Sequence, residues 1–170
     1  DKKIQHLTGK QLQEINLEQN EKIPLLNEIV PLIEKVNVVN IEIKSDGLFQ
    51  GHSIVTPLIQ FLDKQQIDNK CIISSFNPLI ILQLKLRRKK TIIGYLYNRN
   101  QTLHQWNNLV WMIRIRPDNL HIHYSLLDLW IVSWARGKGM KINSYTINER
   151  KVYENAKIDG VFTDNIEYLK

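Results

Sequence analysis

Two residues of opposite charge, Glu42 and Lys44, lie two positions apart in the stretch N-I-E-I-K. If this stretch is a β-strand, both side chains lie on the same face of the sheet. A carboxylate binds a hard divalent cation and a nearby ammonium offsets phosphate charge, so the pair suits a site where a metal and a phosphate meet. The pair could equally be an ion pair that fills the end of a barrel, or the solvated face of an edge strand.

Polar and aromatic side chains also stand at the ends of other expected strands. In parallel α/β proteins, catalytic and binding groups gather at the C-terminal ends of the strands. Histidines at these positions are candidate metal ligands or acid–base groups, although histidines on strands more often have a hydrogen-bonded packing role. Aromatic side chains at these positions could form a wall against a ligand or belong to the core. The residues concerned are Ser74, Ser75, Phe76, His121, His123, Tyr145, Thr146, Asn148, Thr163 and Asp164.

Apolar periodicity predicts strands and helices in alternation along most of the chain. Strands separated by helices imply right-handed crossovers and a parallel sheet, so we expect an α/β fold. No linker or low-complexity segment interrupts residues 1–170, which predicts one domain. The expected strands are 38–44, 71–76, 91–97, 120–124, 140–147 and 160–164. The expected helices are 8–17, one from Pro24, 53–65, 78–86, 125–136 and 149–156, with helical or irregular structure over 101–111.

The charge balance is 23 Lys and Arg against 17 Asp and Glu, a net charge of +6, and the densest basic run is residues 85–90. This run follows an apolar helical stretch, where basic side chains face the negative end of the helix dipole. Neither interleaved aromatic residues nor a nucleic-acid-binding motif accompanies it. We therefore read it as a solvated helix end and expect no nucleic-acid partner.

Cysteine count and hydropathy narrow the class of protein further. Cys71 is the only cysteine, which excludes an internal disulfide. No apolar run reaches the roughly 18–20 residues that cross a bilayer, so no membrane span is predicted. The chain begins at Asp1 rather than Met, so the compartment stays open between cytoplasmic and periplasmic or secreted, as does the oligomeric state.

Taken in order, seven short motifs resemble the glycerophosphodiester phosphodiesterase family. The resemblance covers nearly all 170 residues and implies a TIM-type (β/α) barrel. It also implies metal-dependent hydrolysis of a small glycerophosphodiester to glycerol 3-phosphate and an alcohol, with Mg²⁺ or Ca²⁺ as the divalent cation. The motifs are I-P-L-L-N-E-I (23–29), N-I-E-I-K (40–44), I-I-S-S-F (72–76), I-I-G-Y-L (92–96), H-I-H (121–123), G-M-K-I-N-S-Y-T-I-N (139–148) and D-G-V-F-T-D-N (159–165).

The same resemblance assigns roles to the strand-end residues. It implies that Glu42 is a metal ligand and that Lys44 is the cation on the phosphate side. Tyr145 stands where many members have Trp, and Ile166 stands where many have Pro. The residues that it places against the substrate are Ser75, Phe76, His123 and Tyr145, with the register of His123 against His121 left open.

The chain departs from the family pattern at its N-terminus. The family elements H-R-G, E-N-T, E-x-D and H-D, which supply an acid–base histidine pair and two further acidic metal ligands, do not occur in it. A (β/α)₈ barrel takes about 250 residues, and six of its eight strands are expected here. We therefore expect a partial domain without the N-terminal strands, inactive by itself. The alternative is a truncated or degenerate, non-catalytic member that acts as a binding or interaction module.

Overall fold

The computed structural model describes residues 4–97, 105–155 and 157–169. Backbone packing divides the chain into two compact units, residues 1–37 and residues 38–170. The single domain expected from the sequence stays a prediction. Across the described ranges, no helix combines the length and the apolar character needed to cross a membrane.

The first unit contains two short helices, α1 (Gly9–Glu14) and α2 (Val30–Lys35), and two 3₁₀ turns, Ile4–His6 and Glu18–Asn20. Thr8 caps α1 through a capping box with Gln11, as its position before the helical pattern predicts. The expected helix start at Pro24 is wrong. The helix starts at Val30 because Pro31, in its first turn, supplies the backbone angle that a helix start favours.

The second unit is built on a parallel sheet of six strands whose spatial order is their order in the sequence. This arrangement confirms the predicted α/β fold with a parallel sheet. The strands are β1 (Val39–Glu42), β2 (Cys71–Ser75), β3 (Ile92–Tyr97), β4 (Asn119–His123), β5 (Lys141–Tyr145) and β6 (Gly160–Val161). The last strand is shorter than the expected 160–164.

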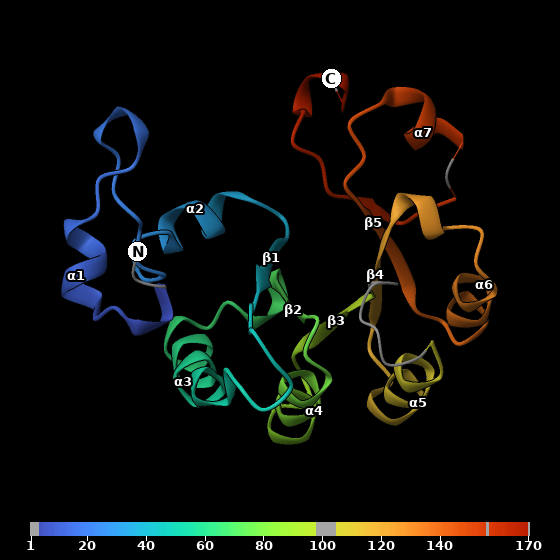
Figure 1. Cartoon of the computed structure of the whole chain (residues 1–170), viewed down its shortest axis with the longest axis horizontal. Helices are drawn as coiled ribbons and strands as arrows, with labels where there is room; N and C mark the ends of the chain where they lie inside the picture. The colour runs from blue at the N-terminus through green and yellow to red at the C-terminus, as the bar shows by residue number, and fades with distance from the viewer. Residues whose placement is uncertain (1–3, 98–104, 156, 170) are drawn as a thin grey trace. The chain divides into compact units, whose positions relative to one another are not determined.

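Helices connect the strands, and in Figure 1 α3 to α6 follow the outer side of the curved row of strands. The expected helix 125–136 is divided into a 3₁₀ turn and α6, and residues 101–104 and 156 of the expected helices lie outside the described residues. The helices are α3 (Val55–Gln65), α4 (Pro78–Arg87), α5 (Gln105–Ile115), α6 (Trp130–Gly137) and α7 (Arg150–Asn155). The 3₁₀ turns are His52–Ile54, Asp68–Lys70, Tyr124–Leu126 and Ile166–Leu169.

The two faces of the sheet differ in character. One face packs against the helices, as shown by the Tyr95 hydroxyl of β3, which donates to Asn108 Oδ1 of α5 at 2.9 Å. Side chains alternate along a strand and partners in register share a face, so the register places the strand-end polar groups on the opposite, inner face. The helix-facing core consists of Ile73, Ile93, Tyr95, Leu120, Ile122 and Ile142. The inner face carries Glu42, Ser74, Gly94, His121, Asn143 and Tyr145.

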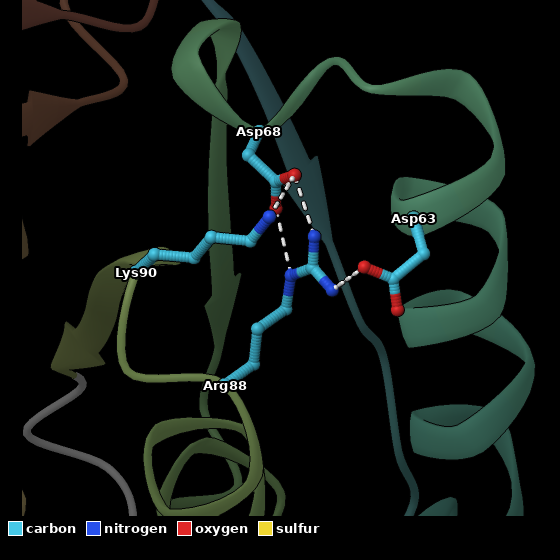
Figure 2. Close-up of polar contacts among 4 residues, drawn as sticks. All are labelled: Asp63, Asp68, Arg88 and Lys90. Carbon is cyan, nitrogen blue, oxygen red and sulfur yellow. Dashed lines mark hydrogen bonds and ion pairs between the residues drawn. The ribbon is translucent and has the colours of Figure 1, made fainter.

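The basic run 85–90 is engaged in ion pairs rather than simply solvated. The Arg88 side chain is 6% exposed and binds Asp68 and Asp63, with Nε to Asp68 Oδ1 at 2.7 Å (Figure 2). Lys90 also contacts Asp68, at 3.4 Å, and Lys85 pairs with Asp118 at 2.9 Å. Asp63, Asp68 and Arg88 join α3, the turn before β2 and the end of α4, which fixes these elements at the N-terminal ends of the strands.

Candidate functional site at the strand ends

Tyr145 is the centre of the inner-face cluster at the C-terminal ends of the strands. Its hydroxyl donates to the carbonyl oxygen of Tyr97, at the end of β3, at 2.7 Å. Its ring meets Phe76 edge-on at a centroid distance of 6.3 Å, and it meets His123 at 5.8 Å and 78°. Groups that follow or end β2, β3 and β4 are therefore gathered around one side chain of β5. Three of the predicted substrate-contacting residues, Phe76, His123 and Tyr145, come together in this way.

The negative charge of Glu42 acts on the same cluster. Burial, together with the smaller effect of the negative charge of Glu42, raises the pKa of Tyr145 to about 12. Tyr145 therefore keeps its proton across the physiological range and acts as a hydrogen-bond donor. Glu42 itself is exposed at the end of β1, so its carboxylate is open to a ligand. Lys44 is also exposed, two residues beyond the strand.

His123, rather than His121, is the histidine at the mouth of the cluster. The backbone N–H of Ser125 donates to its Nδ1 at 3.3 Å, and the Ser125 hydroxyl lies 2.8 Å from the same atom. Because a backbone N–H is always a donor, Nδ1 is an acceptor and the neutral ring carries its proton on Nε2. The Nε2–H group of His123 is thus a hydrogen-bond donor, and the contacts of Nδ1 with Ser125 fix its direction.

His121 lies deeper in the sheet and is fully buried. Its ring covers Gly94, where a Cβ atom would lie 2.6 Å from His121 Cε1, so only glycine leaves room for it. Phe162 packs against the ring at a centroid distance of 5.0 Å. Burial lowers the pKa of His121 to about 4, so this histidine is a neutral packing residue at physiological pH.

The two serines of β2 have different surroundings. Ser74 lies on the inner face beside Gly94, and its buried hydroxyl has no hydrogen-bond partner among the described residues. Ser75 lies on the helix-facing side. Its hydroxyl donates to the Ile43 carbonyl at 2.7 Å and accepts from the Asn77 backbone N–H at 3.1 Å. A direct contact between Ser75 and substrate stays a prediction, and the structure gives its hydroxyl a role in joining β1 to β2.

Asn77 is an organising residue that was not among the residues singled out from the sequence. Its amide Nδ2 lies within 3.0 Å of Ser45 Oγ, Gly47 O and Leu48 O, and 3.3 Å from Gln50 O. Its Oδ1 accepts from backbone N–H groups in the first turn of α4. One side chain therefore holds the loop that follows Glu42 and Lys44 and also caps a helix. The dipeptide Asn-Pro before a helix was the signal that could have revealed the cap.

A second polar group follows β5 and β6. Asn148 Oδ1 accepts from the Thr163 hydroxyl at 3.0 Å and from the Asp164 backbone N–H at 2.9 Å. The Asp164 carboxylate is exposed and lies 3.4 Å from Asn148 Nδ2. Over residues 4–97, 105–155 and 157–169, no three His, Cys, Asp or Glu side chains are grouped so that they could hold a metal ion. Among these residues, the predicted metal ligand Glu42 therefore does not belong to a group of three such side chains.

Comparison with known proteins places this geometry in one family. The sequence model of the Glycerophosphoryl diester phosphodiesterase family matches residues 1–168. A glycerophosphodiester phosphodiesterase of Caldanaerobacter subterraneus subsp. tengcongensis is 31% identical over 153 residues, which is 88% of this chain and 61% of that protein. The chain thus spans about three fifths of the length of this curated relative.

Solved structures agree in fold. The glycerophosphodiester phosphodiesterase of Thermotoga maritima is 27% identical with a TM-score of 0.72, and the match covers 99% of this chain and 71% of that one. A phosphodiesterase of Oleispira antarctica, solved in complex with the product sn-glycerol-3-phosphate, is 27% identical with a TM-score of 0.69, covering 86% of this chain and 59% of that one. The six parallel strands accordingly form part of a TIM-type barrel, as predicted.

Proposed function

This chain belongs to the glycerophosphoryl diester phosphodiesterase family, and from that premise we propose that residues 38–170 carry the substrate-binding part of a metal-dependent phosphodiesterase. The reaction proposed for the whole protein is hydrolysis of glycerophosphodiesters to glycerol 3-phosphate and an alcohol. The observation that supports it most is the convergence of Phe76, His123 and Tyr145 at one end of the sheet, beside the charge of Glu42.

Lys44, which follows β1, and the residues of the cluster each have a role that their chemistry allows. Lys44 offsets the negative charge of the phosphate, and the oriented Nε2–H of His123 donates a hydrogen bond to a substrate oxygen. Phe76 and Tyr145, packed edge to face, form a wall against the glycerol carbons. The Tyr145 hydroxyl is held by the Tyr97 carbonyl, which keeps this wall in place when no substrate is bound.

The described residues do not by themselves fit a divalent cation. Glu42 supplies one carboxylate, whereas Ca²⁺ takes about six to eight oxygen ligands and Mg²⁺ about six. No group of three ligating side chains occurs in the described ranges. We therefore propose that the cation, Mg²⁺ or Ca²⁺, takes further ligands from outside the described residues.

This chain also lacks the groups that proton transfer in the reaction needs. General acid–base hydrolysis needs one group to take a proton from the nucleophile and another to give one to the leaving alcohol. The histidine pair that the family resemblance implies for this work has no counterpart in the sequence. We propose that the 170-residue chain binds glycerophosphodiesters without turning them over. A non-catalytic binding module is therefore the second candidate, and the absence of a three-ligand group among the described residues favours it.

A titration followed by NMR would test the binding half of this proposal. We expect sn-glycerol 3-phosphate and glycerophosphocholine to shift the signals of Phe76, His123 and Tyr145. We expect Lys44→Gln to weaken this binding about tenfold, because a charge-assisted hydrogen bond contributes about 1.5–3 kcal/mol. Lys138→Gln is the matched control, since Lys138 is an exposed cation after α6, before β5, at the opposite end of the strands. Equal losses in the two variants would contradict the assignment of Lys44.

An assay of choline release tests the catalytic half. With glycerophosphocholine and Mg²⁺ or Ca²⁺, we expect no turnover by the 170-residue chain above an EDTA blank. Clear metal-dependent turnover that Glu42→Gln abolishes would show that the chain is catalytic without the histidine pair. In that case the binding-module candidate would be wrong.

A further inference from the structure

The backbone on the N-terminal side of Lys44 is bonded to β2 at two points. The Ile43 N–H donates to the Ser74 carbonyl at 2.7 Å, and the Ile43 carbonyl accepts from the Ser75 hydroxyl at 2.7 Å. Ile43 is 7% exposed and Ser75 is 1% exposed, so water does not compete for these bonds. Although β1 ends at Glu42, the chain therefore stays attached to β2 up to the residue before Lys44.

The backbone on the C-terminal side of Lys44 is held by Asn77. Its amide Nδ2 lies 3.0 Å from Ser45 Oγ, and the Ser45 hydroxyl in turn donates to the Gly47 carbonyl at 3.0 Å. Asn77 is 5% exposed, and its own backbone N–H donates to the Ser75 hydroxyl at 3.1 Å. Two buried side chains that contact each other thus fix the residue before Lys44 and the residue after it. Ser45, Ser75 and Asn77 are called the β1–β2 network below.

Gly51 packs the far end of the same loop against this network. Its φ angle of +77° is one that glycine adopts without strain. A Cβ atom at this position would lie 3.0 Å from Ser45 Cβ and 3.2 Å from Ile80 Cδ1, so an alanine would push on Ser45. At Gly47, in the same loop, a Cβ atom would lie 3.8 Å from Gln50 Cδ, which is an ordinary contact. The two glycines therefore differ in whether a side chain would disturb the network.

The Lys44 side chain depends on its backbone for its direction. Lys44 is exposed, and no ion pair within residues 4–97, 105–155 and 157–169 includes it. A lysine ammonium is carried on a flexible four-carbon stem, which reaches many positions. Fixing the backbone from which the stem starts reduces the entropy that is lost on binding, and preorganisation of this kind raises affinity.

We infer that Ser75 and Asn77 are positioning residues for Lys44: by fixing the backbone on both sides of it, they preorganise its ammonium for the phosphate group of the ligand. The inference rests on the proposed function, because it needs the phosphate group to bind near Lys44. It gives Ser75 a role that acts through the backbone after β1 and needs no contact with the substrate. It also gives Asn77, which lies at the start of α4, a part in ligand binding.

The test is a double-mutant cycle between Asn77 and Lys44, with sn-glycerol 3-phosphate as the ligand of the full chain. Asn77→Ser keeps a side-chain oxygen that can cap α4, adds no charge and loses the amide that bonds to the loop. We expect it to weaken binding about threefold to fivefold, a factor within the range of couplings inside one hydrogen-bond network. In the Lys44→Gln background, we expect Asn77→Ser to change the dissociation constant by less than about twofold.

Asn108→Ser is the matched control for the loss of a buried amide. Asn108 is 7% exposed and accepts from the Tyr95 hydroxyl at 2.9 Å, on the helix-facing side of the sheet. We expect this variant to leave the affinity for sn-glycerol 3-phosphate unchanged. Circular dichroism and urea unfolding measure what each substitution costs in stability. A purely structural loss would not depend on whether residue 44 is Lys or Gln.

A second pair of variants disturbs the network without removing a hydrogen-bonding group. Gly51→Ala places a methyl group against Ser45, whereas Gly47→Ala adds the same group where there is room for it. We expect Gly51→Ala to weaken binding of sn-glycerol 3-phosphate and to lose this effect in the Lys44→Gln background. Gly47→Ala should bind like the wild type. This pair carries the test if Asn77→Ser does not fold.

The outcomes separate this inference from the proposed function. If Lys44→Gln weakens binding but Asn77→Ser and Gly51→Ala do not, the inference is wrong and the proposed function stands. An equal loss from Asn77→Ser with and without Lys44 would also overturn the inference, since the network would then affect binding by another route. If sn-glycerol 3-phosphate does not bind to the wild-type chain, the proposed function is wrong and the inference falls with it.

Discussion

His121 shows how one buried ionisable side chain ties the stability of this protein to pH. Its pKa is about 4 in the folded chain, lowered by burial from an ordinary value of 6.5. Between these values the unfolded chain binds a proton that the folded chain does not. The contribution of His121 to the free energy of unfolding is therefore fully present above pH 6.5 and is lost as the pH falls through 4. The inner face thus has an acid-sensitive point directly below the candidate site.

We predict that the free energy of unfolding falls by about 3 kcal/mol from this residue alone between pH 7 and pH 4, the amount that corresponds to the two pKa values. His121→Leu, of similar volume, should remove this part of the decrease. Urea unfolding of both proteins at several pH values measures it. His123→Gln is the control and should follow the wild-type curve. Parallel curves for wild type and His121→Leu would contradict the prediction.

Single residues also show where sequence reasoning stops. The spacing of Glu42 and the order of the motifs indicate which strand ends carry chemistry. The spacing cannot show that Ser75 donates to the Ile43 carbonyl, a contact between residues 32 positions apart. It also cannot choose between His121 and His123, since both lie on the same face. The two histidines differ in how deeply they are buried, because Gly94 on the neighbouring strand makes room for His121 inside the sheet.

Arg88 fixes the positions of several elements relative to one another at the opposite end of the sheet. Burial would raise the pKa of Asp68, but the hydrogen bond and the charge of Arg88 outweigh it, so the pKa of Asp68 is lowered. The Arg88 side chain is 6% exposed, which leaves its charge almost wholly dependent on its two carboxylate partners. The partners lie 20 and 25 positions away in the sequence, so a basic run read locally looks like a solvated helix end.

We predict that Arg88→Ala lowers the free energy of unfolding by about 2–4 kcal/mol, because it leaves Asp68 with a weaker counter-charge in a mostly buried position. Arg88→Lys should recover only part of the loss, since an ammonium cannot make the forked contact of a guanidinium. Arg87→Ala is the matched control. Arg87 is exposed, and within the described part of the chain the hydrogen bond found for its side chain is the one it donates to Thr56, so its loss should change stability by less than about 0.5 kcal/mol. A similar loss in both alanine variants would refute the role given to Arg88.

At the scale of elements, the strand and helix order was predictable and the boundaries were less so. Alternating apolar patterns locate β1 to β5 and α3 to α5 because each buries one face. The start of α2 was missed because Pro24 and Pro31 both suit a first turn, and the choice depends on which residues can pack. Strand β6 is short because only Gly160 and Val161 pair with β5. Local sequence does not show where a partner strand ends.

At the scale of the whole molecule, the sheet has two edges. In the described ranges β1 pairs only with β2, and β6 pairs only with β5. A strand edge has unpaired N–H and C=O groups that can pair with another chain. We predict that the 170-residue chain self-associates as its concentration rises, measured by light scattering. Val38→Lys, next to β1, should reduce this association, because a charge at an edge opposes pairing.

Val110→Lys is the control for that experiment. Val110 lies on α5 and is 58% exposed, the same fraction as Val38. Both variants add one positive charge to a chain of net charge +6. Association reduced equally by the two variants would point to general charge repulsion, and a stable monomer at high concentration would count against the edge altogether.

The order of the sheet also bears on how the chain reaches its fold. Each strand pairs with the strand before it, so partners such as Val39 and Cys71, or Asn143 and Gly160, are separated by about 17–32 residues. Chains with contacts of short sequence separation fold through small loop closures, and repeated units of this kind can add one after another. Each strand–helix unit can therefore dock on its predecessor as it leaves the ribosome. The six-stranded part can in this way assemble during synthesis without waiting for a barrel to close.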